Sequence, residues 1–338
     1  VSSTYGQFDL GGFPKAAAHW FRNQWLLTVP DESVDKTFPT KGKYEVYIVE
    51  SWEPPNSWNE TKGNTTRTIH VYSNAPKVQL QVNGESVGDP KALIPMREGP
   101  GTYAEFLDVP WKSGSVTALA LDQNGKEVAS MSRYTTSLAK PSQQKLVLSL
   151  DSPSENTGTG SSLFLDGQDA ALLRASIVDD GDNVMHLATN NISFAIVSGP
   201  GAIQGTTNGD PRSHEPNNAP WHSAFHGLVR AVLRVTSVAG RSEYERELLS
   251  HIDHDGPMGF IDQEGHNAIS MDDSDIVVEA SCEGFDSVKI TIPTTTASSA
   301  AALAVAGDTA GEGMLRYFEA GEDDVALSSS WPLETREA

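Results

Sequence analysis

Alternating hydrophobic and polar positions run along most of the chain and predict β-strands rather than helices. In the first half, the alternation forms short runs separated by turn residues. These runs are 44–52, 67–73, 77–82, 103–109, 115–121 and 127–134. Asn83-Gly84 and Asn124-Gly125 lie between such runs and are typical of two-residue hairpin turns. Short strands at this spacing predict an immunoglobulin-like β-sandwich.

The second half carries a similar series that one long loop interrupts. Its predicted strands are 145–150, 170–178, 192–197, 228–235, 276–280 and 287–292. The segment from Gly199 to Gly227 is too rich in glycine, proline and asparagine to be a helix, and it is predicted to be a loop. Loops of this length are usually functional or disordered. Trp221 and Phe225 give this one apolar anchors, so we expect it to be ordered.

One helix is predicted near the N-terminus, over residues 14–25. Pro14 suits a first helical turn, where its missing N–H costs nothing. The residues that fall on one face of this helix are Ala17, Trp20, Phe21, Gln24 and Trp25. A helix this short is marginal by itself. We therefore expect its aromatic face to dock onto a larger body.

The predicted fold class is all-β, with tandem immunoglobulin-like β-sandwiches preceded by one N-terminal helix. Residues 1–40 hold the helix and a linker, 41–140 the first sandwich and 141–296 the second. Residues 297–338 begin with a run of threonine, alanine and serine and are predicted to be a low-complexity tether and tail.

Charge and composition narrow the range of partners. The 338 residues carry a formal net charge of −21. Nucleic-acid phosphates and anionic membranes both attract basic surfaces, so neither partner is expected. No apolar run reaches the roughly 18 residues that span a bilayer. Neutral sugars and cationic partners remain open.

Cysteine usage and glycosylation motifs point to different compartments. Cys282 is the only cysteine, so no internal disulfide forms, which fits the cytosol. Three N-glycosylation triplets, beginning at Asn59, Asn64 and Asn191, favour secretion instead. We expect a secreted glycoprotein. The first residues lack the features of a signal peptide, so Val1 is expected to lie at a cut in a longer chain.

Two groups of residues are candidates for carbohydrate binding. Asn208 and Asp210 could bind a sugar while Trp221 stacks on its ring, or the Asn208-Gly209-Asp210-Pro211 segment is a self-capping turn. The other group is a set of tryptophans that either stack on a glycan or pack between domains. They are Trp52, Trp58 and Trp111.

Other clusters of ligand-type residues do not predict a metal site. The segment 251–255, with Asp262 and His266, matches no standard zinc spacing. The segment 272–275 lacks the glycine and the distal glutamate of a calcium loop. Both are predicted to be solvated charge, and no metal or cofactor is expected. The sequence also shows no nucleophile elbow, phosphate loop or dinucleotide fingerprint.

Three stretches resemble glycoside hydrolase family 2, the β-galactosidase family. The second sandwich resembles the last immunoglobulin-like domain of that family, and the first resembles the domain that precedes it in many bacterial-type members. The opening is similar to the last strand-to-helix corner of the family's (β/α)8 barrel. The matching residues are 178–183, 192–194, 199–201, 208–211, 213–215 and 224–227 in the second sandwich, 71–84 in the first, and 5–15 in the opening.

This resemblance implies that a catalytic barrel is missing from the chain and would cover the aromatic face of the helix. The two glutamates of a retaining glycosidase belong to earlier barrel strands, so this chain should not hydrolyse a substrate alone. Tyr5 and Asp9 would border the substrate cleft of the parent enzyme, or form a structural turn.

The resemblance therefore predicts a non-catalytic C-terminal region that braces the barrel or mediates assembly, with the barrel, carbohydrate and a second copy of the chain as partners. The alternative is a stand-alone glycan-binding or structural glycoprotein module. A barrel carrying both glutamates, encoded before Val1, would favour the first interpretation.

Overall fold

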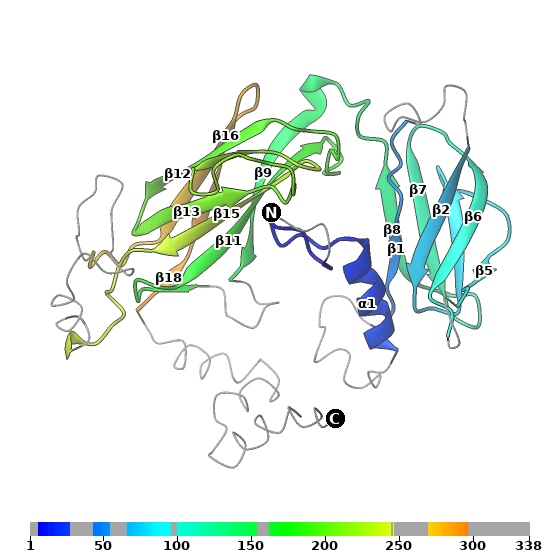
Figure 1. The fold of residues 1–338 in the computed structure, drawn as a ribbon, viewed down its shortest axis with the longest axis horizontal. Helices are drawn as coiled ribbons and strands as arrows, with labels where there is room; N and C mark the ends of the chain where they lie inside the picture. The colour runs from blue at the N-terminus through cyan, green and yellow to red at the C-terminus, as the bar shows by residue number, and fades with distance from the viewer. Residues whose placement is uncertain are drawn as a thin grey trace, which may run out of the picture.

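The computed structural model describes residues 6–27, 43–54, 66–95, 100–153, 162–244, 246 and 270–296. Two β-sandwiches lie side by side, and α1 (Ala16–Leu26) lies between them against the first (Figure 1). The fold is therefore an all-β sandwich region with an N-terminal helix, as the sequence predicted. Within the described ranges, no helix is long and apolar enough to cross a membrane.

Two antiparallel sheets form the first sandwich. One has the order β1 (Val46–Ile48), β2 (Thr66–Ser73), β6 (Tyr103–Pro110). The other has the order β4 (Glu85–Ser86), β3 (Lys77–Val82), β7 (Ser115–Leu121), β8 (Glu127–Tyr134), and β5 (Lys91–Ala92) also pairs with β3. Alternate residues of β7 point inward, so Val116, Ala118 and Ala120 are buried. This period of two builds the core.

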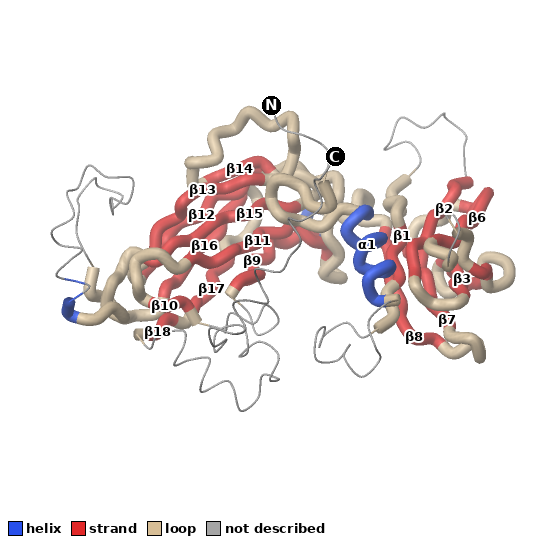
Figure 2. Tube along the Cα trace, turned by 60° about the horizontal axis from the view of Figure 1, so that its bottom comes forward, coloured by secondary structure: helices blue, strands red, loops and turns tan. Residues whose placement is uncertain are grey.

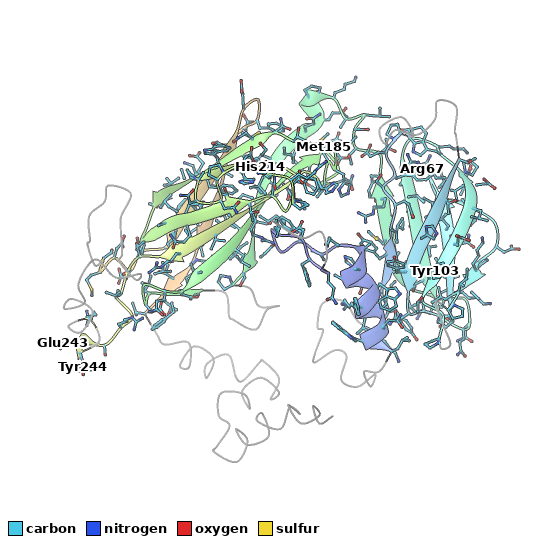
Figure 3. All side chains as sticks on the ribbon, in the orientation of Figure 1. Arg67, Tyr103, Met185, His214, Glu243 and Tyr244 are labelled. Carbon is cyan, nitrogen blue, oxygen red and sulfur yellow. The ribbon has the colours of Figure 1, made fainter. Side chains whose placement is uncertain are left out.

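Two four-stranded sheets form the second sandwich. One has the order β13 (Gly201–Thr207), β15 (Leu228–Val235), β11 (Ala170–Asp179), β9 (Gln144–Ser152). The other has the order β14 (Trp221–Ser223), β12 (Asn191–Ser198), β16 (Ile276–Cys282), β17 (Val288–Ile292). A short parallel pair, β10 (Leu163–Phe164) with β18 (Thr294–Thr295), closes one end (Figure 2). Side chains fill the interior of both sandwiches (Figure 3), and Cys282 is buried in the second core.

The linker between the sandwiches contains the short 3₁₀ turn η2 (Pro141–Gln143) and is held by the buried carboxylate of Glu53. Thr136 donates to this carboxylate through its backbone N–H at 3.1 Å and its hydroxyl at 2.6 Å, and the Ser137 N–H donates at 3.1 Å. Because the carboxylate accepts three hydrogen bonds from the linker, its burial is compensated. The contact fixes where the chain leaves the first sandwich.

Both hairpin predictions can be compared with the turns that form. Asn83 and Gly84 both have positive φ and join β3 to β4, as a two-residue turn requires. At Asn124-Gly125 the two-residue prediction is wrong. Only Gly125 has positive φ, and the turn is longer because the Asp122 carboxylate accepts hydrogen bonds from the N–H groups of Asn124 and Lys126. A local side-chain cap therefore selected a different turn.

The prediction of one long loop from Gly199 to Gly227 is also wrong in part. β13 and β14 lie inside this segment and form the edges of the two sheets of the second sandwich. β13 pairs with β15 through a β-bulge between Ile203 and Gly205, which obscures its alternation. The irregular part is the stretch between the two strands, and it returns to β13 where the Thr206 N–H donates to Asn217.

The second core offers a matched test of burial. Leu173 and Leu172 are neighbours on β11, but Leu173 is 0% exposed and Leu172 is 39% exposed. We expect Leu173→Ala to lower the free energy of unfolding by about 2–5 kcal/mol, because it removes buried contacts and leaves a cavity. Leu172→Ala should change it by about 0.5 kcal/mol or less. Urea unfolding measures both, and equal losses would contradict the assigned faces of β11.

Candidate functional site

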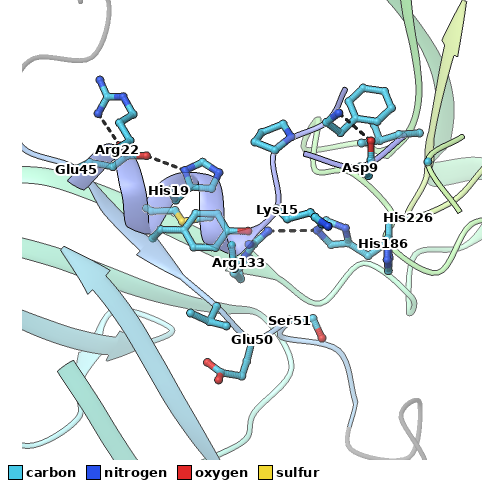
Figure 4. A pocket seen from close by; sticks show the side chains of 18 of the residues that line it. Asp9, Lys15, His19, Arg22, Glu45, Glu50, Ser51, Arg133, His186 and His226 are labelled. Carbon is cyan, nitrogen blue, oxygen red and sulfur yellow. Dashed lines mark hydrogen bonds and ion pairs between the residues drawn. The ribbon is translucent and has the colours of Figure 1, made fainter. Parts of the chain in front are cut away.

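A cleft of about 1130 Å³ lies where α1 and the two sandwiches meet. Its walls come from the segment before α1, the first half of α1, strands β1 and β8, and loops of the second sandwich (Figure 4). Binding sites often form where domains meet, because a concave surface needs more than one wall. This cleft is therefore the candidate functional site.

The segment before α1 is a tight corner that Asp9 holds together. The Asp9 Oδ1 atom accepts hydrogen bonds from the N–H groups of Gly11 at 2.8 Å and Phe13 at 2.9 Å. Phe8 and Pro14 form an antiparallel bridge across the corner. Asp9 lines the cleft, and its carboxylate caps the turn. The geometry thus supports the structural alternative for Asp9, while Tyr5 lies outside the described residues.

Arg230 of β15 fastens this corner to the second sandwich. Its side chain is on the outer face of the sheet but only 6% of the residue is exposed. Its Nε donates to the Gly11 carbonyl at 2.9 Å, and its Nη1 donates to the Asp151 carboxylate at 2.6 Å. The guanidinium carbon lies 4.4 Å from the centre of the Phe13 ring, in cation–π geometry. The corner therefore covers a buried charge and accepts one of its hydrogen bonds, while Asp151 of β9 supplies the opposite charge.

The segment Asn208-Gly209-Asp210-Pro211 meets the same corner from the other side. The Asn208 amide donates to the Ser223 carbonyl at 2.8 Å and accepts from the Asp210 N–H at 2.9 Å. Gly209 has φ +83°, and a Cβ there would lie 2.3 Å from the Asp9 carboxylate. Only glycine fits this conformation and this close approach. The geometry supports the self-capping turn, and sugar binding by Asn208 and Asp210 stays a prediction.

Asp210 is paired within its own turn. Its carboxylate accepts from the Arg212 N–H at 2.9 Å and from the Arg212 side chain at 3.1 Å. Burial tends to raise the pKa of Asp210, but the hydrogen bonds and charge of Arg212 outweigh it and leave this pKa below its ordinary value. The carboxylate is therefore ionised and occupied at neutral pH.

The first sandwich fastens α1 through Glu45, which precedes β1. The Glu45 carboxylate accepts from His19 at 2.7 Å and from Arg22 at 2.5 Å, one helical turn apart. Burial of Glu45 tends to raise its pKa, but the hydrogen bonds from His19 and Arg22 outweigh burial, and the pKa lies below 4.5. The His19 ring also stacks on Tyr47 at 3.9 Å. The ionised carboxylate thus holds the helix to the sheet.

His186 lies deep in the cleft beside Arg133 of β8. The Arg133 Nη1 atom is 3.5 Å from His186 Nε2, and the His226 ring centre is 6.3 Å from that of His186. Burial, followed by electrostatic repulsion from Arg133 and His226, lowers the pKa of His186 to about 4, although the Glu53 carboxylate acts in the opposite direction. His186 is therefore neutral near pH 7.

The aromatic face of α1 is covered in part, since Trp20 and Phe21 are half-buried and Trp25 is exposed. Phe21 lies 5.0 Å from Trp20 and 5.9 Å from Trp25, measured between ring centres. Trp25 is 58% exposed, although it is a large apolar side chain. In the described part of the chain, the buried Trp20 Nε1 and Gln24 Nε2 atoms have no hydrogen-bond partner. This face has the composition of an unfinished interface.

Several predicted site residues lie outside the described residues, namely Trp58, Asn59, Asn64 and the 251–266 cluster. Asn191 begins β12 and is exposed, so its glycosylation stays a prediction. Trp221 is half-buried on β14. Across the ranges that the structure describes, no three histidine, cysteine or acidic side chains gather in a way that would hold a metal ion.

Trp52 neither stacks on a glycan nor packs between the domains, so both alternatives given for it are wrong. Trp52 is 1% exposed in the first core, its indole N–H donates to the Lys112 carbonyl at 2.9 Å, and its ring lies 6.4 Å from that of Trp111. The sequence shows a tryptophan next to two prolines but not which way it points. Burial inside the sandwich decided its role.

The residues that shape the cleft were missed at the sequence level. Arg230 occupies an outward position of an apolar strand, where an arginine normally reaches solvent. Glu45 and Arg133 likewise look like ordinary surface charges in the sequence. The partners of Arg230 and Glu45 are far away along the chain, so only the folded arrangement reveals them.

Comparison with known proteins identifies both sandwiches. The profile of glycoside hydrolase family 2 C-terminal domain 5 matches residues 157–244, and that of a domain of unknown function, DUF4982, matches residues 64–129. A β-galactosidase of Bacteroides ovatus is 27% identical over 246 residues, which are 72% of this chain and 24% of that protein. A β-glucuronidase of Formosa agariphila is 26% identical over 216 residues, 63% of this chain and 18% of that protein.

Solved structures share the fold. A β-glycosidase from Bacteroides vulgatus superposes with a TM-score of 0.59 at 18% identity, covering 86% of this chain and 28% of that chain. A family 2 member from Bacteroides cellulosilyticus gives 0.57 at 20% identity, covering 86% and 32%. The chain spans about a quarter of the length of the first curated relative. The profiles, the relatives and the shared fold agree that this chain corresponds to a C-terminal part of a glycoside hydrolase family 2 protein.

Proposed function

We propose that this chain is the non-catalytic C-terminal β-sandwich region of a β-galactosidase-like glycoside hydrolase, and that it braces the catalytic barrel. One observation carries the proposal. The corner and helix before the first sandwich are gripped from two sides, by Arg230 of the second sandwich and Glu45 of the first, while the Trp25 side of α1 is open. Such an arrangement holds an element in position for a third body.

The third body would be the barrel of the same gene product. The similar proteins are a β-galactosidase and a β-glucuronidase, and this chain spans 24% and 18% of their lengths. A retaining glycosidase needs an acid/base carboxyl and a nucleophilic carboxylate across the scissile bond. We propose that both carboxyl groups belong to the barrel. The two sandwiches would hold the corner before α1, which would be the last strand-to-helix corner of that barrel. Hydrolysis of O-glycosidic bonds is then an activity of the parent enzyme.

The proposal also covers the localisation, glycosylation and partners of the full-length enzyme. We propose that it is secreted and glycosylated at Asn191, which is exposed at the start of β12. Carbohydrate contact and assembly of two copies are also proposed for the parent. A stand-alone glycan-binding module is the alternative, and Trp111 and Trp221 are the half-buried aromatic candidates among the described residues.

Activity assays test the bracing role. We expect the purified chain to release no nitrophenol from nitrophenyl β-galactoside. The barrel encoded before Val1, expressed separately, should bind the chain in size-exclusion chromatography and gain activity from it. Trp25→Asp should abolish this binding, because it places a charge in an apolar interface. Leu172→Asp, an exposed position on the second sandwich, is the control. Full activity of the barrel without the chain would contradict the proposal, and glycan binding by the isolated chain would favour the alternative.

Arg230→Met tests the grip of the second sandwich on the corner. Losing one partner of a buried ion pair costs about 3 kcal/mol, and the corner should detach. Hydrogen exchange of peptides covering residues 7–15 should become at least about tenfold faster. Arg234→Met is the control, since Arg234 is on the same strand and donates to the Gly167 carbonyl instead. Unchanged exchange in the Arg230 variant would show that other contacts hold the corner.

Glu45 predicts a pH dependence of the docking of α1. Its pKa is lowered in the folded state, so its stabilising effect is fully present above its ordinary value of 4.5 and is lost as the pH falls through the folded-state value. Tryptophan fluorescence from Trp20 and Trp25 should report undocking in this acid range. Glu45→Gln should remove the transition and weaken docking at neutral pH, whereas Glu85→Gln, an exposed control, should not. A transition that persists in Glu45→Gln would assign it to another carboxyl group.

A further inference from the structure

One end of the cleft collects basic side chains from four separate elements. Lys15 is the N-cap of α1, Arg133 belongs to β8, His186 follows β11, and His226 precedes β15. Figure 4 shows Lys15 and Arg133 pointing toward the His186 ring, with His226 beside it. The chain as a whole carries a net charge of −21, so a local cluster of basic groups runs against its composition.

The acidic residues of the cleft are engaged elsewhere. Asp9 caps its own corner, and Glu45 is paired with His19 and Arg22. Glu50 accepts from the backbone and the ring of His70 at 2.7 and 2.6 Å. The Glu53 carboxylate accepts hydrogen bonds from Thr136 and Ser137. Its charge tends to raise the pKa of His186, but it does not hydrogen-bond to that ring. Among the described residues, therefore, no carboxylate hydrogen-bonds to Arg133 or His186.

The helix terminus adds to the positive potential. Pro14, Lys15 and Ala16 line the cleft, so the N-terminal end of α1 opens into it. The helix has no side-chain cap, and its first turn has no acidic residue. Backbone N–H groups at a helix N-terminus favour an anion. Here that terminus is combined with a cavity and with basic side chains from both sandwiches.

We propose that this end of the cleft, bounded by Lys15, Arg133, His186 and His226, binds the oxyanion group of a small acidic ligand. Arg133 directs its Nε and Nη2 atoms to the Ile48 carbonyl, which fixes the guanidinium and leaves Nη1 facing His186. Because Arg133 donates to Nε2, neutral His186 carries its proton on Nδ1 and can donate it to the ligand. Lys15 and the start of α1 line the same end of the cleft and add to its positive potential.

The oxyanion can come from two sources with the same chemistry. A free inorganic oxyanion such as sulfate would pair with the basic side chains and would leave the rest of the cleft empty. The carboxylate of an acidic sugar would do so too, and a cleft of about 1130 Å³ has room for its ring. A bound oxyanion would also raise the pKa of His186, which is lowered to about 4 by burial and by the charges of Arg133 and His226.

Calorimetric titration of the 338-residue chain with sulfate, galacturonate and neutral galactose tests the proposal, with chloride at equal ionic strength as the reference. We expect sulfate and galacturonate to bind and galactose not to bind. Tighter binding of galacturonate would identify an acidic sugar, and equal binding a free oxyanion. Histidine NMR signals should show the pKa of His186 rising when either oxyanion is present. Absence of binding by both oxyanions would overturn the proposal.

Matched variants locate the site. Lys15→Met should weaken oxyanion binding about tenfold, as the loss of one charge-assisted contact does. Lys126→Met removes the same charge from an exposed hairpin and should bind as the unmodified chain does. His186→Gln is the second variant, in case Lys15→Met alters the helix, and thermal unfolding checks that each is folded. Binding that survives both Lys15→Met and His186→Gln would refute the assignment. The test does not depend on the barrel.

Discussion

The arrangement of the molecule depends on the buried guanidinium of Arg230. A charge removed from water on the outer face of a sheet is costly unless it is paired and hydrogen-bonded. Asp151 supplies the opposite charge, the Gly11 carbonyl accepts one N–H, and the Phe13 ring covers the cation. Because two of these three partners belong to the N-terminal corner, detaching the corner would expose Phe13 and leave part of the guanidinium unsatisfied.

The position of α1 follows from this constraint. The helix begins directly after the corner and reaches the first sandwich, where Glu45 binds His19 and Arg22. The two sandwiches are thus joined through the corner and helix, as well as through the linker that Glu53 holds. The cleft exists because these two connections run apart from each other. The same contacts decide where the charged residues of the cleft lie. The carboxylates of Asp9 and Glu45 hold the corner and the helix, and Arg133 and His186 lie together in the cleft.

This organisation fits the family comparison. Residues 157–244 match the profile of glycoside hydrolase family 2 C-terminal domain 5, and the chain spans 24% of the length of its first curated relative. The helix whose inner side is fixed by both sandwiches presents Trp25 on its outer side. The same rigid support that would position a barrel corner also shapes the basic cleft, so bracing and ligand binding are compatible in one structure.

Local alternation of hydrophobic and polar residues was enough to predict most of the longer strands. β3, β7, β8 and β15 have the predicted bounds. In β7 the period of two, which the strand sets locally, is also the period of burial in the core. The helix was predicted within two residues at each end, and the resemblance to the family followed from short motifs in strands and turns. β13 and β14 were missed because glycine, a bulge and neighbouring polar residues disguise their alternation. The folded arrangement was needed to show that Trp52 is core and to choose the capped turn at Asn208 from the two alternatives. It was also needed to show that Arg230, Glu45 and His186 line or secure one cleft. The contacts of a charged side chain depend on partners far away along the chain, as Gly11 is for Arg230, and a local sequence pattern contains no information about such partners.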